Sequence, residues 1–275
     1  SFLTLTALVP LAKPESPEYI GYAIVLALII GLVQLLMGFF RLGFILNFIS
    51  HSVITGFTIA AAIIIASTQI PSLFGFRVEK HEFVFLNFYE IILGLPGASL
   101  LTALIGVSSV VLIITAKKKI SKAFPAALVV MVVGILLSYF LGLEAKNVAV
   151  IGDINARISL PAIPTLSFGN VSTLLPSALI IAIIGFLEAY AVSKSISSQT
   201  RQKLDVNQEL IGQGLGNVAS SLFKGYPIAG SFSRTAVNFS AGAVSGISSV
   251  FVSLFVLITI LFLTPFIYFL PKAIL

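Results

Sequence analysis

The stretch at residues 225–238 reads GYPIAGSFSRTAVN and carries the strongest local signal for the fold. Its first half holds two glycines and a proline, which disfavour a helix, so we expect an extended segment before Ser231. Ser231 and Ser233 are good N-cap residues, and a helix can begin beside them. Because apolar runs flank this stretch, it predicts a helix that starts inside a membrane.

The composition of the 275 residues predicts that membrane. Hydrophobic residues make up 58% of the chain and charged residues 9%, against about 25% charged in an ordinary soluble domain. A soluble fold could not bury so much apolar surface. We therefore exclude a soluble enzyme, a nucleic-acid binder and a disordered regulator. The expected fold class is an all-α polytopic membrane protein lying in the lipid bilayer.

Cofactors and metals are not expected from the residues present. The chain has no cysteine and two histidines, His51 and His81, which stand 30 positions apart without ligand spacing around them. A metal site built on these residues is therefore not predicted.

Apolar runs of about 20 residues predict the membrane spans. Five runs fit one span each: 20–40, 44–70, 91–116, 124–141 and 174–192. A weaker, glycine-rich run covers 210–223, and 226–270 predicts a broken helix followed by a full span. Residues 1–11 predict the end of a further span.

Basic residues predict the orientation in the membrane. The dense clusters at 117–122 and 194–203 fall on the same side as Arg41, and that side is predicted to be cytoplasmic. A multi-pass protein of the cell membrane is expected.

Glu188 lies inside the run 174–192 and is the first candidate for chemistry. Acidic residues within membrane spans usually face a cavity or a partner, so Glu188 could bind a proton or another cation during transport. The alternative is a carboxylate that reaches the aqueous interface, since the apolar run ends four residues later.

Arg234 is the second candidate, because a chain break, two N-cap residues and a cation coincide there. The first N–H groups of the predicted helix have no backbone partner and carry the positive end of the helix dipole. Together with the Ser233 hydroxyl and the Arg234 guanidinium they predict an anion site. The alternative is a re-entrant kink whose arginine only reaches the lipid headgroups.

Gly212, Gly214, Gly216 and Ala219 mimic a dinucleotide-binding pattern. No strand is expected before them and no acidic residue follows about 20 positions later, so that interpretation fails. Close packing between helices is the better one.

Four stretches together resemble the SulP anion transporters, the sulfate permease family. They are residues 32–43, 46–58, 185–189 and 230–238. The resemblance implies fourteen membrane segments in two inverted repeats of seven, with discontinuous half-helices at segments three and ten. On this basis residues 1–275 are an interior part of the transmembrane domain, from segment three to the start of segment twelve, without a STAS domain. Core-type segments would be 1–40 and 172–264, and gate-type segments 44–142.

The resemblance also implies roles for individual residues. The anion would lie at Gly230, Ser231, Phe232, Ser233 and Arg234, and Glu188 would serve coupling to a proton or to sodium. The resulting hypothesis is proton-coupled sulfate uptake, by an elevator-like movement of the core against the gate.

Several alternatives to this function stay open at the level of sequence. They are a bicarbonate or dicarboxylate transporter, an anion exchanger of the same family, a nucleobase permease of related fold, and a membrane protein that transports nothing. Arg234 stands where a nucleobase site would want an acidic residue. A homodimer and a bacterial inner membrane are further implications of the resemblance.

Overall fold

A computed structural model describes residues 2–14, 16–44, 51–76, 78, 84–121, 124–153, 159–164 and 168–275. His81 and residues 46–50 of the second resembling stretch lie outside these residues. The described chain is built from helices and connecting segments, in this order: α1 (Phe2–Leu8), α2 (Pro17–Phe39), α3 (His51–Phe74), α4 (Val84–Gly94), α5 (Leu100–Lys119), α6 (Ala126–Leu141), α7 (Phe168–Thr200), α8 (Val206–Leu222), α9 (Phe232–Ser240), α10 (Ile247–Ile258) and α11 (Thr264–Ile267).

Four helical stretches of the described residues are long and apolar enough to cross a membrane: Pro17–Phe39, Leu100–Lys119, Gly169–Thr200 and Ile247–Ile267. The prediction of an all-α polytopic membrane protein is confirmed. The last stretch joins α10 to α11 through a π-helical turn at Thr259–Leu263, so its backbone groups stay paired as lipid requires.

The predicted span 91–116 is wrong as a single helix. A 3₁₀ turn at Leu95–Gly97 separates α4 from α5. Pro96 cannot continue the backbone hydrogen bonds of α4. Ser99 then caps α5, its hydroxyl accepting a hydrogen bond from the Thr102 N–H at 3.4 Å. Hydropathy alone missed this break because the flanking residues are apolar on both sides.

Helix α7 is longer than the predicted span 174–192. It runs for 33 residues, from Phe168 to Thr200, and holds Pro176 near its beginning. Glu188 therefore lies 12 residues before the helix end, which at 1.5 Å per residue is about 18 Å.

By contacts the described chain divides into two compact units. The first unit comprises residues 1–58 and 158–236, and the second comprises residues 59–157 and 237–275. The assignment of a core and a gate by function stays a prediction.

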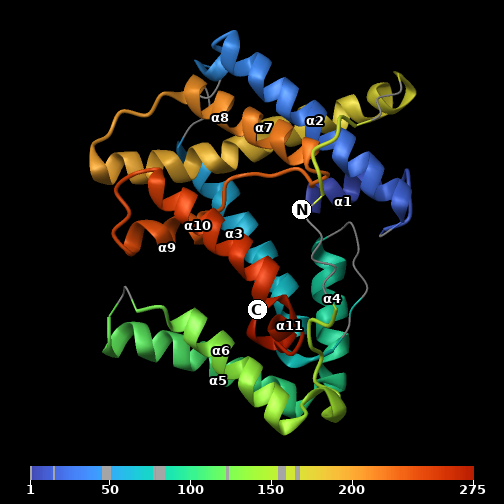
Figure 1. Ribbon diagram of the computed structural model, residues 1–275, viewed down its shortest axis with the longest axis vertical. Coiled ribbons are helices and arrows are strands. Elements are labelled where there is room, and N and C mark those ends of the chain that lie inside the picture. The colour runs from blue at the N-terminus through green and yellow to red at the C-terminus, as the bar shows by residue number, and fades with distance from the viewer. Residues whose placement is uncertain are drawn as a thin grey trace. The chain divides into compact units, whose positions relative to one another are not determined.

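The first unit is built on α2, α7 and α8, which pack against one another (Figure 1). Glycines permit the close contact of α2 with α8: a Cβ on Gly31 would stand 2.9 Å from the Gly214 carbonyl oxygen, and one on Gly38 would stand 2.9 Å from that of Asn207. The prediction of close helix packing around Gly214 is confirmed. Buried apolar side chains of α1, α2 and α7 complete the core, among them Leu8, Leu26, Ile30 and Leu174.

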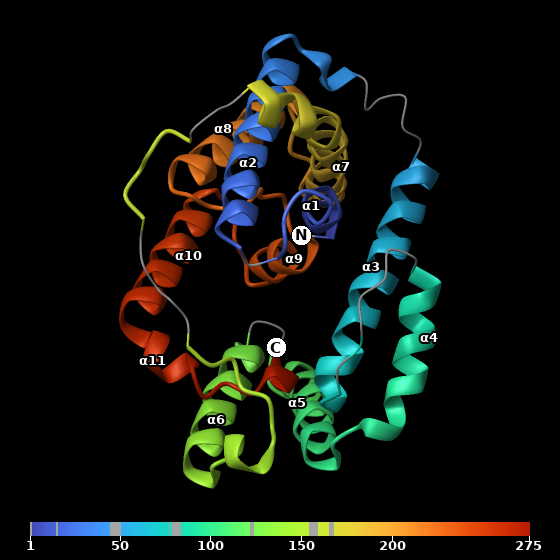
Figure 2. The ribbon, with the colours of Figure 1, turned by 90° about the vertical axis from the view of Figure 1, so that its right-hand side faces the viewer.

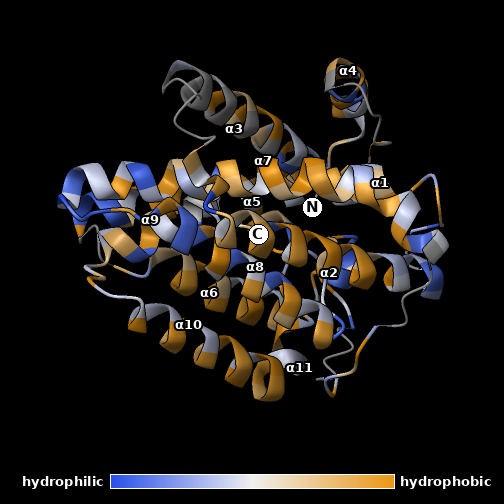
Figure 3. Ribbon diagram, turned by 90° about the horizontal axis from the view of Figure 1, so that it is seen from above, coloured by the Kyte–Doolittle hydropathy of each residue, from blue (hydrophilic) through white to orange (hydrophobic). Residues whose placement is uncertain are grey.

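The second unit contains α5 and α6 side by side, and the C-terminal 3₁₀ turn Lys272–Ile274 contacts both of them (Figure 2). Residues 149–152 pair with 268–272 through the bonds Lys272 N–H to Ala149 O, at 2.8 Å, and Ile151 N–H to Leu270 O, at 3.0 Å. The α10–α11 span is coloured as hydrophobic along most of its length in Figure 3.

Candidate functional site

The connection from α8 to α9 is the site that the sequence singles out. The backbone turns at Lys224, which adopts a left-handed φ of 59°, and residues 225–231 are not helical. Helix α9 then begins at Phe232, and the Ser231 carbonyl accepts its first bond from the Thr235 N–H at 3.1 Å. The predicted break and helix start at residues 225–238 are confirmed.

Asn217 of α8 holds this extended segment by its backbone. Its side-chain oxygen accepts a hydrogen bond from the Ile228 N–H at 2.9 Å, and its side-chain nitrogen donates to the Ile228 carbonyl at 3.0 Å. The Asn217 side chain is fully buried. Both backbone groups of Ile228 therefore have hydrogen-bond partners on α8. Backbone N–H and C=O groups away from water need such partners.

Gln34 of α2 extends this contact to two further helices. Its side-chain oxygen accepts from the Asn217 amide nitrogen at 3.0 Å. Its nitrogen donates to the Ala182 carbonyl of α7 at 3.2 Å and to the Gln213 side-chain oxygen of α8 at 3.3 Å. Gln34 is 1% exposed. A buried amide network therefore joins α2, α7 and α8 to the 226–231 segment.

Small residues let the segment lie close to α7 and α8. A Cβ on Gly230 would stand 2.9 Å from the Ala189 Cα atom, and one on Gly216 would stand 3.1 Å from the Ile228 side chain. Ala229 likewise faces Gly185 of α7, at 3.6 Å from a Cβ built there. Any side chain at Gly230 would push the segment away from α7.

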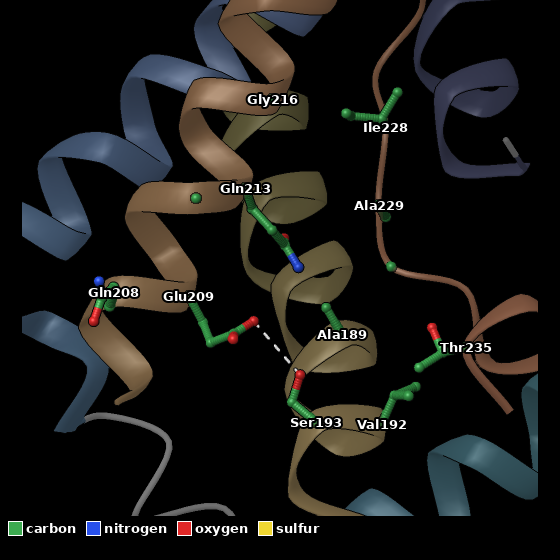
Figure 4. A pocket seen from close by; sticks show the side chains of 12 residues that line it. Ala189, Val192, Ser193, Gln208, Glu209, Gln213, Gly216, Ile228, Ala229 and Thr235 are labelled. Atoms are coloured by element: carbon green, nitrogen blue, oxygen red, sulfur yellow. Dashed lines mark hydrogen bonds between the residues drawn. The ribbon is translucent and has the colours of Figure 1, made fainter. Parts of the chain in front are cut away.

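A cavity of about 420 Å³ adjoins the segment within the first unit (Figure 4). Glu209 and Gln213 point into it from α8, and Ser193 from α7 (Figure 4). The Ser193 hydroxyl donates a hydrogen bond to the Glu209 carboxylate at 3.5 Å. The other residues that line the cavity are Ala189, Val192, Gln208, Gly212, Gly216, Ile228, Ala229, Gly230 and Thr235.

The predicted site residues have different surroundings. Gly230 lines the cavity, Ser231 is half-buried, and Arg234 is exposed on the first turn of α9 without lining the cavity. The backbones of Phe232 and Ser233 belong to α9, while their side chains lie outside the described residues. The roles of these residues in anion binding stay predictions.

Glu188 is half-buried on α7 and does not line the cavity. Its neighbour in the chain, Ala189, does line the cavity and contacts Gly230. Glu188 therefore lies one residue from the contact between α7 and the segment. Its role in cation coupling stays a prediction.

Sequence reasoning missed the amide side chains of Gln34 and Asn217 and the carboxylate of Glu209. Gln34 stands inside the apolar run 20–40, and a polar residue at such a position could have indicated a buried contact. Asn217 was obscured by the surrounding glycines. Glu209 was obscured by its position in the first turn of α8, where a carboxylate favours the helix dipole.

Comparison with known proteins gives a coherent set of similarities. The family model described as "Sulfate permease family" matches residues 1–275. Sulfate transporter 4.1, chloroplastic, from Arabidopsis thaliana is 32% identical over 278 residues, which are 99% of this chain and 40% of the relative. The sodium-independent sulfate anion transporter of Bos taurus is 33% identical over 287 residues, covering 92% of this chain and 47% of the relative.

A solved structure is similar to this chain in fold. The murine Slc26a9 anion transporter in the inward-facing state matches with a TM-score of 0.80 at 28% identity, over 94% of this chain and 43% of that one. The chain thus spans between 40% and 47% of the length of these three proteins.

Proposed function

The chain belongs to the sulfate permease family, and we propose that it forms part of the transmembrane domain of a secondary transporter for an inorganic anion, sulfate above others. The multi-pass helices agree with a membrane protein of this kind. The observation that carries the proposal is the start of helix α9 at Phe232. It directly follows the segment 226–231, whose backbone Asn217 holds by hydrogen bonds.

The chemistry of that helix start favours an anion. The first turn of a helix presents N–H groups without backbone partners and the positive end of the helix dipole. Arg234 adds a guanidinium in the same turn, exposed and able to make two parallel bonds to an oxyanion. Discontinuous helices in transporters direct such N-termini at anionic substrates.

Coupling to a proton through Glu188 completes the proposal. A carboxylate within a membrane span is expected to serve function rather than stability. Glu188 adjoins the Ala189–Gly230 contact, so its protonation could change how α7 packs against the anion segment. Sodium is the alternative coupling ion. The elevator movement, the homodimer and the bacterial inner membrane stay predictions.

The decisive test is uptake of labelled sulfate into proteoliposomes holding the full-length protein, with and without an inward proton gradient. We expect gradient-stimulated uptake that Arg234→Ala abolishes and that Glu188→Gln makes indifferent to the gradient. Arg201→Ala, in the exposed turn after α7, and Glu18→Gln, exposed at the start of α2, are matched controls that should leave uptake unchanged.

Other outcomes would replace parts of the proposal. Uptake that ignores the gradient in the wild type would indicate an exchanger or a uniporter and remove Glu188 from coupling. Stronger uptake of bicarbonate or a dicarboxylate than of sulfate would change the substrate. Sulfate binding that survives Arg234→Ala would place the anion elsewhere.

A further inference from the structure

The amide network of Gln34 and Asn217 has a fixed direction. The Ile228 N–H can only donate, so the Asn217 atom that it meets must be the side-chain oxygen. The Asn217 nitrogen then donates to Gln34, and the Gln34 nitrogen donates to Gln213. Each amide thus has one orientation that satisfies all its partners, and the segment's own backbone sets that orientation.

Gln213, the last residue in this series of hydrogen bonds, faces the cavity. Because its side-chain oxygen accepts from Gln34, Gln213 turns its amide nitrogen towards the cavity (Figure 4). The network therefore joins the backbone at Ile228 to a cavity that Gly230 and Thr235 also line.

The network is placed where packing alone would hold the segment poorly. Residues 225–231 make no helical bonds, and their neighbours on α7 and α8 are small: Gly185, Ala189 and Gly216. Small side chains permit close approach, but they do not prevent an extended backbone from sliding along its own axis. The Ser220 hydroxyl of α8 donates to the Tyr226 carbonyl at 2.7 Å, and the two bonds between Asn217 and Ile228 fix the segment further along, four residues before α9 begins.

Because the amides are buried, losing one of these hydrogen bonds costs free energy. Asn217 is 0% and Gln34 is 1% exposed, so no water can replace a lost amide partner without rearrangement. A buried polar group that loses its partner is costly, and a fully satisfied network favours one arrangement. The arrangement that it favours connects the segment to α2, which is itself packed along α8.

From this geometry we infer that Asn217 and Gln34 are positioning residues: they fix the 226–231 segment on α2 and α8, so that α9 presents its N-terminus to the anion in one position. Neither side chain is placed on the anion itself. The inference rests on the proposed function for its effect on transport, but its structural part can be tested without any transport.

The structural test labels a single introduced cysteine: residues 1–275 contain none of their own, and any cysteine elsewhere in the full-length protein is replaced first. A spin label on Ile228→Cys reports directly on the segment, because the Ile228 side chain is 50% exposed. We expect Asn217→Leu, which removes both bonds to the Ile228 backbone, to increase the mobility of the label strongly. Gln34→Met leaves those two bonds in place and removes their support from α2, so we expect a smaller increase.

Sulfate uptake by the full-length protein without the label gives the functional arm. We expect the KM for sulfate to rise about tenfold or more in Asn217→Leu and about threefold in Gln34→Met, with Vmax per folded molecule changing less. The matched control is Gln199→Met, because Gln199 is exposed and its amide donates to the Ser195 carbonyl of its own helix, at 3.3 Å. It should change neither the label nor the KM.

The two arms separate the possible failures. If Gln34→Met and Asn217→Leu reach the membrane folded and leave label mobility unchanged, the positioning role is wrong. It is equally wrong if the label loosens and the KM for sulfate stays the same. If Asn217→Leu does not fold, Gln34→Met alone decides by the same two criteria. Absence of uptake in the wild type, with the expected label mobilities, would overturn the proposed transport and leave the segment's attachment supported.

Discussion

Helix α2 and the α10–α11 span are both long apolar helices, yet residues 1–275 bury them very differently. Within an apolar stretch of 18 residues in each helix, 44% of α2 is buried, whereas 0% of the Ile247–Ile267 span is buried. Gly31, Gln34 and Gly38 lie on one face of α2 and contact α8, α7 or both. The α10–α11 span contains no glycine and no amide side chain.

This comparison separates two requirements of a membrane helix. An apolar sequence makes the bilayer a suitable solvent, but lipid is as apolar as leucine, so apolarity does not bring helices together. Close packing at small residues and hydrogen bonds between helices do so. In α2 both features occur on the same face, and the 226–231 segment is attached to the helices that this face joins.

The largest expected effect tests the packing itself. Leu26 of α2 is fully buried, and Leu26→Ala should lower the free energy of unfolding by about 2–5 kcal/mol through the cavity it leaves. Leu254 of α10 is 49% exposed, and Leu254→Ala should change it by less than about 0.5 kcal/mol. SDS titration of the purified protein measures both. Equal losses would show that Leu254 packs against protein in the full-length molecule, and the comparison would fail.

A smaller effect tests the glycine contacts between α2 and α8. The Cβ of Gly214→Ala would stand 2.8 Å from the Leu35 backbone nitrogen and 2.9 Å from the Gly31 carbonyl. Because backbone atoms cannot move aside as a side chain can, we expect a loss of about 1–3 kcal/mol. Gly212→Ala in the same helix meets nothing within 4 Å and should cost nothing. A neutral Gly214→Ala would mean that the two helices are held by other contacts.

The smallest effect concerns single hydroxyl bonds. Ser221 of α8 is fully buried and donates to the Ile24 carbonyl of α2 at 2.9 Å, whereas Ser253 of α10 donates to Ser249 of its own helix at the same distance. Ser221→Ala should cost about 0.6 kcal/mol, the average for such bonds between membrane helices. Ser253→Ala should be neutral in the same unfolding assay. If the two variants lose the same free energy of unfolding, hydroxyl bonds between helices do not contribute to the difference between α2 and the α10–α11 span.

Much of the fold was predictable because lipid imposes a simple rule on the chain. Apolar runs predicted the span at α2 and the shorter helix α6, and the glycines and proline of residues 225–230 predicted the break before α9. The single span 91–116 was wrong, because Pro96 and Ser99 act on local geometry that a hydropathy average does not detect. Helix α7 exceeded its predicted length at both ends, because residues 168–173 and the mostly polar residues 193–200 are also helical.

The candidate site was only partly predictable. Gly230, Ser231 and the start of α9 follow from local sequence preference, since glycine and serine act through their own backbone. The attachment of the segment did not follow, because Gln34 and Asn217 are 183 positions apart. Nothing local to either residue indicates the other.

Sequence alone predicted that this protein lies in a membrane and that the chain breaks before α9, and it led to the hypothesis that the start of α9 offers N–H groups and an arginine to an anion. These properties depend on each residue's own backbone preference and on its transfer from water to lipid, so they can be read along the chain. The folded structure was needed to show that α2 and α8 meet at Gly31 and Gly214, and that Asn217 holds Ile228. The reason is physical: a buried amide needs a partner, and which partner it finds depends on how distant segments are brought together.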